Sequence, residues 1–294
     1  MQTLRQIAIL LCAGVIFAGC SELEKRAFSP QVSGELAAMG MQTASYENGV
    51  VTLTGRSGTI RLKNESQWAE IGNIPITLTG NSTISSEGVL DIPDLIFKTQ
   101  LEPIIADRRF PIRRIVLDPG HGGSDRGALS AHGADEKKLN LLLAQTIAYE
   151  LKKRGFEVFL TRSNDSFVSL DERPAAVKKF KADLFVSIHH NSAPRQGACG
   201  FEIYSLRCND PQEMANSGSS ANLAYHLYRA LAPLNHFPGR GVKAARFKVL
   251  RLAGIPAVLL EAGFLSNPVE SAYLATPLYR QQFAVKFAET LAKF

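Results

Sequence analysis

The chain has 294 residues, of which 45% are hydrophobic and 20% are charged, and its formal net charge is +6. This composition is that of an ordinary soluble globular protein, and it argues against a disordered chain and against a membrane channel. The basic residues form no dense cluster interleaved with aromatic ones, so the mild positive charge gives no support for nucleic-acid binding.

The first 19 residues predict a secretion signal. Arg5 gives a weakly basic start, and residues 7–19 form an apolar stretch too short to span a bilayer comfortably. The string FAGC (17–20) resembles the lipobox of bacterial lipoproteins, in which the cysteine becomes the lipid-modified first residue. We therefore expect a lipid anchor on Cys20 and a location at the periplasmic side of a membrane, with the outer membrane as one candidate. The alternative is an ordinary signal peptide cleaved nearby, with Cys20 incidental.

Residues 20–45 are a mixture of small and polar residues, and we expect them to form a tether. Residues 46–100 predict a small antiparallel β module, because aliphatic and β-branched residues alternate with polar ones between turn residues at hairpin distances. The expected strands are 49–55, 58–64 and 74–80.

This module is similar to the small N-terminal module of copper amine oxidases, which is also attached to several cell-wall hydrolases. The resemblance implies no copper chemistry, because residues 46–95 contain neither His nor Cys. The module could serve substrate docking or spacing, or it could be structural cover for the main domain. Residues 101–112, with Pro103 and Pro111, are the expected linker.

From Arg113 to the end, apolar strand patterns and helical patterns alternate regularly, which predicts an α/β domain over 113–294. The expected strands are 113–118, 156–161, 183–189, 200–205, 244–250 and 256–261. The expected helices are 136–154, 169–181, 219–232 and 277–292.

Three polar side chains lie where predicted strands of this domain end. They are His121 after 115–118, His189 after 183–188 and Glu261 after 256–260. The crevice outside strand carboxyl ends is where open α/β sheets bind ligands, and Glu136 joins these residues from the first turn of a helix. Two imidazoles and a carboxylate can hold a zinc ion, with a fourth position left for water, and a further carboxylate can move that water's proton.

Each of these residues also has a simpler interpretation. The glycine-rich loop around His121 could cradle phosphate, but it has neither the GxGxxG spacing nor the Lys and Ser/Thr of a P-loop. Glu136 alone would suit the positive end of the helix dipole. Asp118 is either an acceptor for a ligand imidazole or a cap of the turn. His190 points to the opposite face from His189 by strand alternation, so we choose His189 as the ligand.

Other polar residues leave alternatives open. Asn191 and Arg240 are close in sequence to the site loops and could bind substrate, although a surface role suits Arg240 equally. Cys199 and Cys208 bracket a predicted strand, so their separation would approach ~30 Å, which is beyond disulfide reach unless the loop folds back.

Several strings occur in the order and approximate spacing of the zinc-dependent N-acetylmuramoyl-L-alanine amidases of the amidase-3 type, which the chain resembles over about 113–293. They are IVLDPGHGGSDRGA, EKKLN, LTRSNDSFVSLDER, ADLFVSIHHNS, GFEIYSL, RGVK, VLR and PAVLLEAGFLSNPVE. The resemblance implies a mixed, twisted β-sheet flanked by helices. It also implies zinc ligation by His121, Glu136 and His189, with Glu261 as the catalytic glutamate.

By this resemblance, the substrate would be peptidoglycan and the bond cleaved would be the amide between N-acetylmuramic acid and L-alanine. A zinc peptidase acting within the stem peptide and a non-catalytic wall-binding lipoprotein are the alternatives. Some family members carry a helical insertion that blocks the metal until an activator removes it. Here residues 207–220 are short and polar, which predicts a loop and speaks against that form of autoinhibition.

Overall fold

The computed structural model describes residues 10–12, 29–31, 38–56, 58–84 and 90–294, so Cys20 and most of the expected signal lie outside the described residues. The chain divides into two compact units, Met1–Asp107 and Arg108–Phe294. Within the described ranges, no helix combines the length and the hydropathy needed to cross a bilayer.

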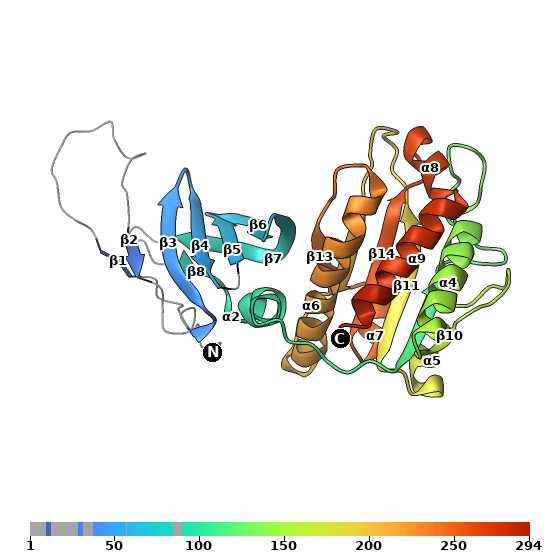
Figure 1. Ribbon diagram of the computed structural model, residues 1–294, viewed down its shortest axis with the longest axis horizontal. Coiled ribbons are helices and arrows are strands. Elements are labelled where there is room, and N and C mark those ends of the chain that lie inside the picture. Colours follow the sequence, from blue (N-terminus) through green and yellow to red (C-terminus); the bar gives the residue numbers. More distant parts are fainter. Residues whose placement is uncertain (1–9, 13–28, 32–37, 57, 85–89) are drawn as a thin grey trace. The chain divides into compact units, whose positions relative to one another are not determined.

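The first unit is built on an antiparallel sheet in which consecutive strands are neighbours (Figure 1). Buried and half-buried positions alternate along these strands, so Val51, Leu53, Ile60 and Leu62 form one apolar face. The strands are β3 (Met41–Glu47), β4 (Val50–Gly55), β5 (Gly58–Lys63), β6 (Ser66–Ile71) and β7 (Ile74–Ile84), with β8 (Leu90–Asp91) paired to β7 and a separate pair β1 (Leu10–Cys12) and β2 (Ser29–Gln31).

The first part of the expected linker, residues 101–105, is helical. A short helix α2 (Asp94–Ile96) continues into a π-helical turn, Phe97–Leu101, and then into α3 (Glu102–Ile105). Pro103 lies in the first turn of α3. Ile104 and Ile105 are buried, and this apolar stretch therefore folds with the first unit, which ends at Asp107.

The second unit contains a mixed sheet in the order β10, β9, β11, β14, β12, β13. The first four of these strands are parallel, whereas β12 runs antiparallel to β14 and parallel to β13. The carboxyl ends of β9, β11 and β14 therefore meet the amino ends of β12 and β13 at one edge. The bounds are β9 (Arg114–Pro119), β10 (Glu157–Leu160), β11 (Leu184–Asn191), β12 (Glu202–Leu206), β13 (Val242–Ala245) and β14 (Ala257–Phe264).

Helices cover both faces of this sheet, as the resemblance implied. One face carries α4 (Glu136–Lys153), α6 (Met214–Leu231) and α9 (Pro277–Leu291), with α9 between the other two (Figure 1). The other face carries α5 (Glu172–Phe180) and α7 (Lys248–Ala253), which pack on an apolar core that includes Val116 and Phe185. The expected α/β class and the mixed sheet are confirmed.

Two predicted elements of the second unit differ from the structure, and one helix there was not predicted. Residues 214–220 belong to α6 instead of a loop, because Ser217 and Ser220 hydrogen-bond backbone carbonyls with their hydroxyls and so fit a buried helix face. The expected strand 244–250 is the shorter β13 followed by α7, which ends at Gly254 in the left-handed conformation. An unpredicted helix, α8 (Pro268–Leu274), follows β14, and the Asn267 side chain caps it.

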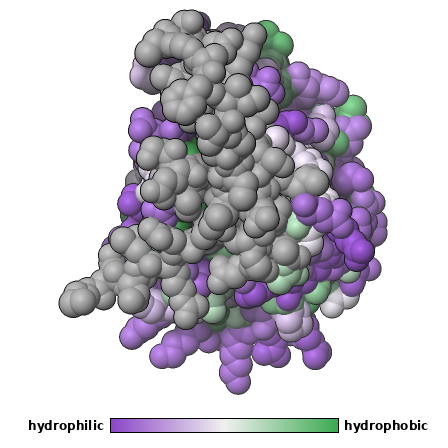
Figure 2. Space-filling view, turned by 90° about the vertical axis from the view of Figure 1, so that its left-hand side faces the viewer, coloured by the Kyte–Doolittle hydropathy of each residue, from purple (hydrophilic) through white to green (hydrophobic). Residues whose placement is uncertain are grey.

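Figure 2 shows how hydrophilic and hydrophobic residues are distributed on one face of the molecule. On the face shown in Figure 2, the described residues are mostly hydrophilic, and hydrophobic ones appear only in small areas among them. Single exposed apolar side chains of this kind are normal on soluble domains.

Candidate metal centre

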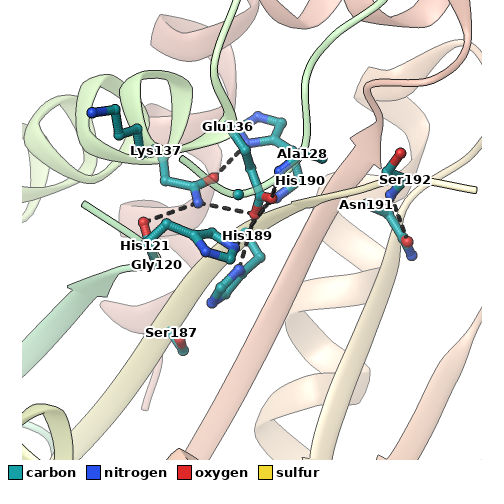
Figure 3. A network of polar contacts seen from close by, with 12 residues as sticks. Gly120, His121, Ala128, Glu136, Lys137, Ser187, His189, His190, Asn191 and Ser192 are labelled. Carbon is teal, nitrogen blue, oxygen red and sulfur yellow. Dashed lines mark hydrogen bonds and ion pairs between the residues drawn. The ribbon is translucent and has the colours of Figure 1, made fainter. Parts of the chain in front are cut away.

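Three potential metal ligands converge at the sheet edge where β9 and β11 end. His121 follows β9, Glu136 is the first residue of α4, and His189 is near the end of β11. Glu136 Oε2 lies 3.2 Å from His121 Nε2, and Glu136 Oε1 lies 3.0 Å from His189 Nδ1. Figure 3 shows the Glu136 carboxylate reaching between the two imidazoles.

The spacing of these ligands suits a tetrahedral zinc ion. One ligand atom from each residue can be chosen so that all three lie within 4.8 Å of one another. Atoms about 2.1 Å from a tetrahedral ion are about 3.4 Å apart, so small side-chain movements would complete the coordination. The imidazoles of His121 and His189 are 24% and 21% exposed, so the site is open to solvent on one side.

The backbone of the loop after β9 passes close to the candidate metal ligands. His121 has φ +61°, which turns the chain sharply after β9 and aims its ring back at the sheet edge. Gly127, with φ +65°, passes so near the ligands that a Cβ there would lie 2.6 Å from Glu136 Oε2 and 2.7 Å from His121 Cδ2. The missing side chain of Gly127 therefore lets the backbone pass close to His121 and Glu136.

Glu136 is held as a carboxylate. Burial acts to raise its pKa, but the two imidazoles outweigh burial and place the pKa well below the ordinary value. Its oxygens also accept hydrogen bonds from the Ala128 backbone N–H at 2.9 Å and the Asn140 side-chain amide at 3.1 Å. The ligand is thus ionised and oriented by fixed donors, as a metal site requires.

His121 has a carboxylate partner that the sequence did not single out. Asp125 Oδ2 lies 2.8 Å from His121 Nδ1, which leaves Nε2 facing Glu136. Burial acts to lower the pKa of His121, but Glu136 and Asp125 outweigh burial and raise it. A carboxylate on the far nitrogen fixes the ring and makes the near nitrogen more basic, which are features of histidine ligands of metals.

Asp118 does not contact an imidazole. It is fully buried, and it accepts hydrogen bonds from Thr161 Oγ1 at 2.6 Å, Arg173 Nη1 at 2.8 Å and Ser187 Oγ at 2.9 Å. Arg173 in turn donates from Nη2 to the His121 carbonyl at 2.9 Å. Asp118 therefore acts through Arg173 on the backbone of the loop that carries His121, because β9 directs its side chain toward α5 and away from the imidazoles.

A second buried arginine holds the same loop. Arg162 donates from Nε to the Pro119 carbonyl at 3.0 Å and from Nη2 to the Gly120 carbonyl at 2.9 Å. Burial lowers the pKa of Arg162 first, and the nearby charge of Arg173 adds to this effect. The two guanidinium groups thus fix successive carbonyls from Pro119 to His121.

His190 lies outside the triad, as strand alternation predicted. It is buried on the α4 side, where Nδ1 lies 2.7 Å from Asn140 Oδ1. Burial lowers its pKa to about 4, so the ring is neutral near pH 7. His190 is therefore a core residue that buttresses Asn140, a donor to Glu136.

Glu261 lies beside the triad on β14. It is opposite His189 on β11 and opposite Glu202 on β12, so the three residues form one row across the sheet. One oxygen of Glu261, Oε2, is buried without a hydrogen-bond partner among the described residues. Burial raises its pKa well above the ordinary value, and the charges of Glu136 and Glu202 raise it further, with Lys243 opposing. This carboxyl group therefore holds a proton more readily than an ordinary glutamate does.

Asn191 lies apart from the triad (Figure 3), and its amide donates to Glu202 Oε1 at 2.8 Å. Sequence reasoning missed Glu202, a buried carboxylate that also contacts Tyr204, Arg240 and Lys243. The sequence of its strand shows only the usual alternation of apolar and polar residues, and only the pairing of Glu202 with Glu261 shows that it lies near the site.

Cys199 and Cys208 are both free.

A mixed α/β sheet with a His, Glu, His triad at its edge and a buried glutamate beside it forms a candidate metal site of a kind suited to hydrolysis. The family model described as N-acetylmuramoyl-L-alanine amidase (amidase-3) matches residues 115–293. The chain therefore belongs to this family, and it is a peptidoglycan amidase. The resemblance predicted from the sequence motifs is confirmed.

Relatives and solved structures agree with this assignment. The chain is 30% identical to the N-acetylmuramoyl-L-alanine amidase AmiA of Escherichia coli (strain K12), over 62% of this chain and 76% of AmiA. It is 39% identical to the probable cell wall amidase LytH of Staphylococcus epidermidis, over 58% of this chain but only 54% of LytH. The catalytic domain of the amidase CwlV from Bacillus (Paenibacillus) polymyxa var. colistinus superposes with a TM-score of 0.55 at 33% identity, covering 62% of this chain and 97% of that domain.

Proposed function

We propose that His121, Glu136 and His189 bind zinc and that Glu261 is the general base and acid of the amidase reaction. The observation that carries this proposal is the row formed by His189 and Glu261 on neighbouring parallel strands, with the other two ligands beside it. The donor set of two imidazoles and one carboxylate is typical of catalytic zinc sites.

A bound zinc ion would polarise the scissile carbonyl and lower the pKa of a water at its open position to about 7. Glu261 would take the proton of the attacking water and return it to the departing amine of L-alanine. Its raised pKa suits both transfers, because the group can hold the proton between them. The bond broken is the amide that joins the lactyl group of N-acetylmuramic acid to L-alanine, and the stem peptide is released.

We also propose that Cys20 carries a lipid that anchors the enzyme at the periplasmic side of a membrane. The support is the FAGC string at the end of an apolar stretch that follows Arg5. Labelling with a radioactive fatty acid should mark the wild type and leave Cys20→Ser unmarked. Label that persists in Cys20→Ser would refute the anchor at this residue.

Digestion of intact sacculi by the purified mature protein tests the reaction. We expect free stem peptides beginning with L-alanine, identified by mass spectrometry, and we expect a chelator to stop their release. Cuts within the stem peptide would instead establish a peptidase. Undiminished release of the same peptides after complete zinc removal would refute the zinc proposal.

A further inference from the structure

Arg240 lies at the same sheet edge as the metal triad. It lies two residues before β13, which is parallel to β12, and both of these strands begin where β14 ends. The first residue of β12, Glu202, is opposite Glu261. Neighbouring strands are about 4.8 Å apart, so an arginine on this side of Glu202 can reach the space next to Glu261.

The Arg240 side chain is fixed before any ligand arrives. Its Nε donates to Glu202 Oε2 at 2.8 Å, and its guanidinium lies over the Phe264 ring at 4.9 Å from the centroid. Its backbone N–H donates to the Phe201 carbonyl at 2.9 Å. The first two contacts hold the guanidinium plane and the third holds the backbone, so binding a ligand there loses little conformational entropy.

The two Nη atoms of this guanidinium have no hydrogen-bond or ion-pair partner in the part of the chain that the structure describes. Among the described residues, no hydrogen bond or ion pair engages Nη1 or Nη2 of Arg240, and its side chain is 40% exposed. By contrast, Arg173 uses both Nη atoms on Asp118 and backbone carbonyls, and Arg246 uses both on Glu213. Arg240 therefore presents a free pair of donors in the geometry that matches a carboxylate.

The charges around Arg240 favour an anion. Lys243 also pairs with Glu202, so this cluster holds two positive groups against one buried carboxylate. Burial acts to raise the pKa of Glu202, but Lys243 and Arg240 outweigh burial and lower it, so Glu202 remains charged. The ion-paired group of Arg240, Lys243 and Glu202 thus carries one net positive charge, and the carboxyl groups of Glu261 and Glu270 lie close enough to interact with Lys243 and Arg240.

We propose that Arg240 binds a carboxylate of the stem peptide and so makes the enzyme select anionic peptides. This proposal rests on the proposed amidase reaction. The sugars are neutral and the lactyl carboxyl is part of the scissile amide, so the charges near the cut are on the peptide. An extended residue spans about 3.3 to 3.6 Å, which places the carboxyl of the second residue about 7 Å from the cut, within reach of Arg240.

Binding to the Glu261→Gln variant, in which turnover should be at least about 10²-fold slower, tests this inference. Two N-acetylmuramoyl tripeptides serve as probes; they differ only in whether the α-carboxyl of the second residue, D-glutamate, is free or amidated. Isothermal titration should show at least about tenfold tighter binding of the free acid, because a bidentate charge-assisted contact is lost on amidation. When Arg240→Gln is added to the Glu261→Gln variant, the dissociation constants of the two probes should come within about twofold of each other, mainly because the free acid binds more weakly.

Two further variants separate recognition from folding. Arg246→Gln, which removes an arginine whose Nη atoms are already paired, should keep the tenfold preference. Arg240→Lys keeps the positive charge next to Glu202 and should keep the fold, while part of the preference is lost. Equal affinity for both probes in the Glu261→Gln protein, or a preference that survives Arg240→Gln, would overturn the inference. Failure to release peptides from sacculi would contradict the amidase mechanism separately.

Discussion

Gly120 lies directly against the imidazole of His189. A Cβ atom at Gly120 would lie 2.1 Å from Cε1 and 2.3 Å from Nε2 of that ring. Gly120 also donates its N–H to the Ile188 carbonyl at 3.0 Å, so its backbone cannot withdraw without breaking a contact between β9 and β11. The absence of a side chain at this position is therefore a condition for the ligand's orientation.

Gly120→Ala should displace the His189 ring and weaken zinc binding by at least about tenfold, a loss of the size seen when support for a ligand is removed. Competition with a chromophoric chelator measures the affinity. The matched control is Gly197→Ala, whose added Cβ would meet only Arg195 Nε at 3.6 Å. Unchanged zinc affinity in Gly120→Ala would show that the ring does not need its present position.

Asp125→Ala should reduce zinc affinity by about 10- to 100-fold, because His121 loses the carboxylate that fixes its ring. The same chelator competition applies. Asp171→Ala removes an exposed carboxylate paired with Lys248 and should leave the affinity unchanged. An equal loss in both variants would mean that general electrostatics, and not the contact to His121, sets the affinity.

The sequence predicted the triad because its members are at strand and helix ends. His121, His189 and Glu261 end apolar runs, and parallel strands bring such ends to one edge. It could not identify Asp125 as the partner of His121, because that contact depends on the left-handed turn at His121 itself. Asp118 is closer to His121 in sequence and was the candidate for this role, but its side chain pairs with Arg173 instead.

Other differences have similar causes. The small polar residues at the start of α6 resemble a loop until their hydroxyls are seen to bond backbone carbonyls inside the fold. The position of Glu202 near the site depends on the antiparallel pairing of β12 with β14, and short-range sequence patterns do not reveal which distant strands pair. Local spacing therefore predicted the three residues of the candidate metal site, whereas the residues that support them required the tertiary structure.

Glu261→Gln should lower the rate of peptide release by about 10²-fold or more, since a general base and acid contributes about 10² to 10⁴. Zinc content, measured by elemental analysis, should equal that of the wild type, because Glu261 is not a ligand in this proposal. Substantial remaining activity with zinc bound would exclude Glu261 as the proton carrier.

The same variant makes a pH-dependent prediction for the stability of the metal-free protein. The folded-state pKa of Glu261 is raised, so its contribution to stability is fully present below the unfolded pKa of about 4.3 and is lost as the pH rises through the folded pKa. Glu261→Gln removes this charging cost. Its melting temperature should exceed that of the wild type at pH 7, and the difference should shrink near pH 4. A constant difference across this range would show that the carboxyl titrates normally.

Arg173→Met should destabilise the catalytic unit, because it leaves the buried Asp118 carboxylate without its charge partner at 2.8 Å. Breaking a buried pair in this way typically costs about 3–5 kcal/mol, which urea unfolding can measure. Arg154→Met is the control, since its partner Glu150 keeps Lys153 and Gln281, and it should cost clearly less.

Arg173→Lys should recover part of the stability but not the zinc affinity, because an ammonium cannot reproduce the forked contacts to Asp118 and the His121 carbonyl. Full recovery of zinc affinity in Arg173→Lys would show that charge alone positions the His121 loop.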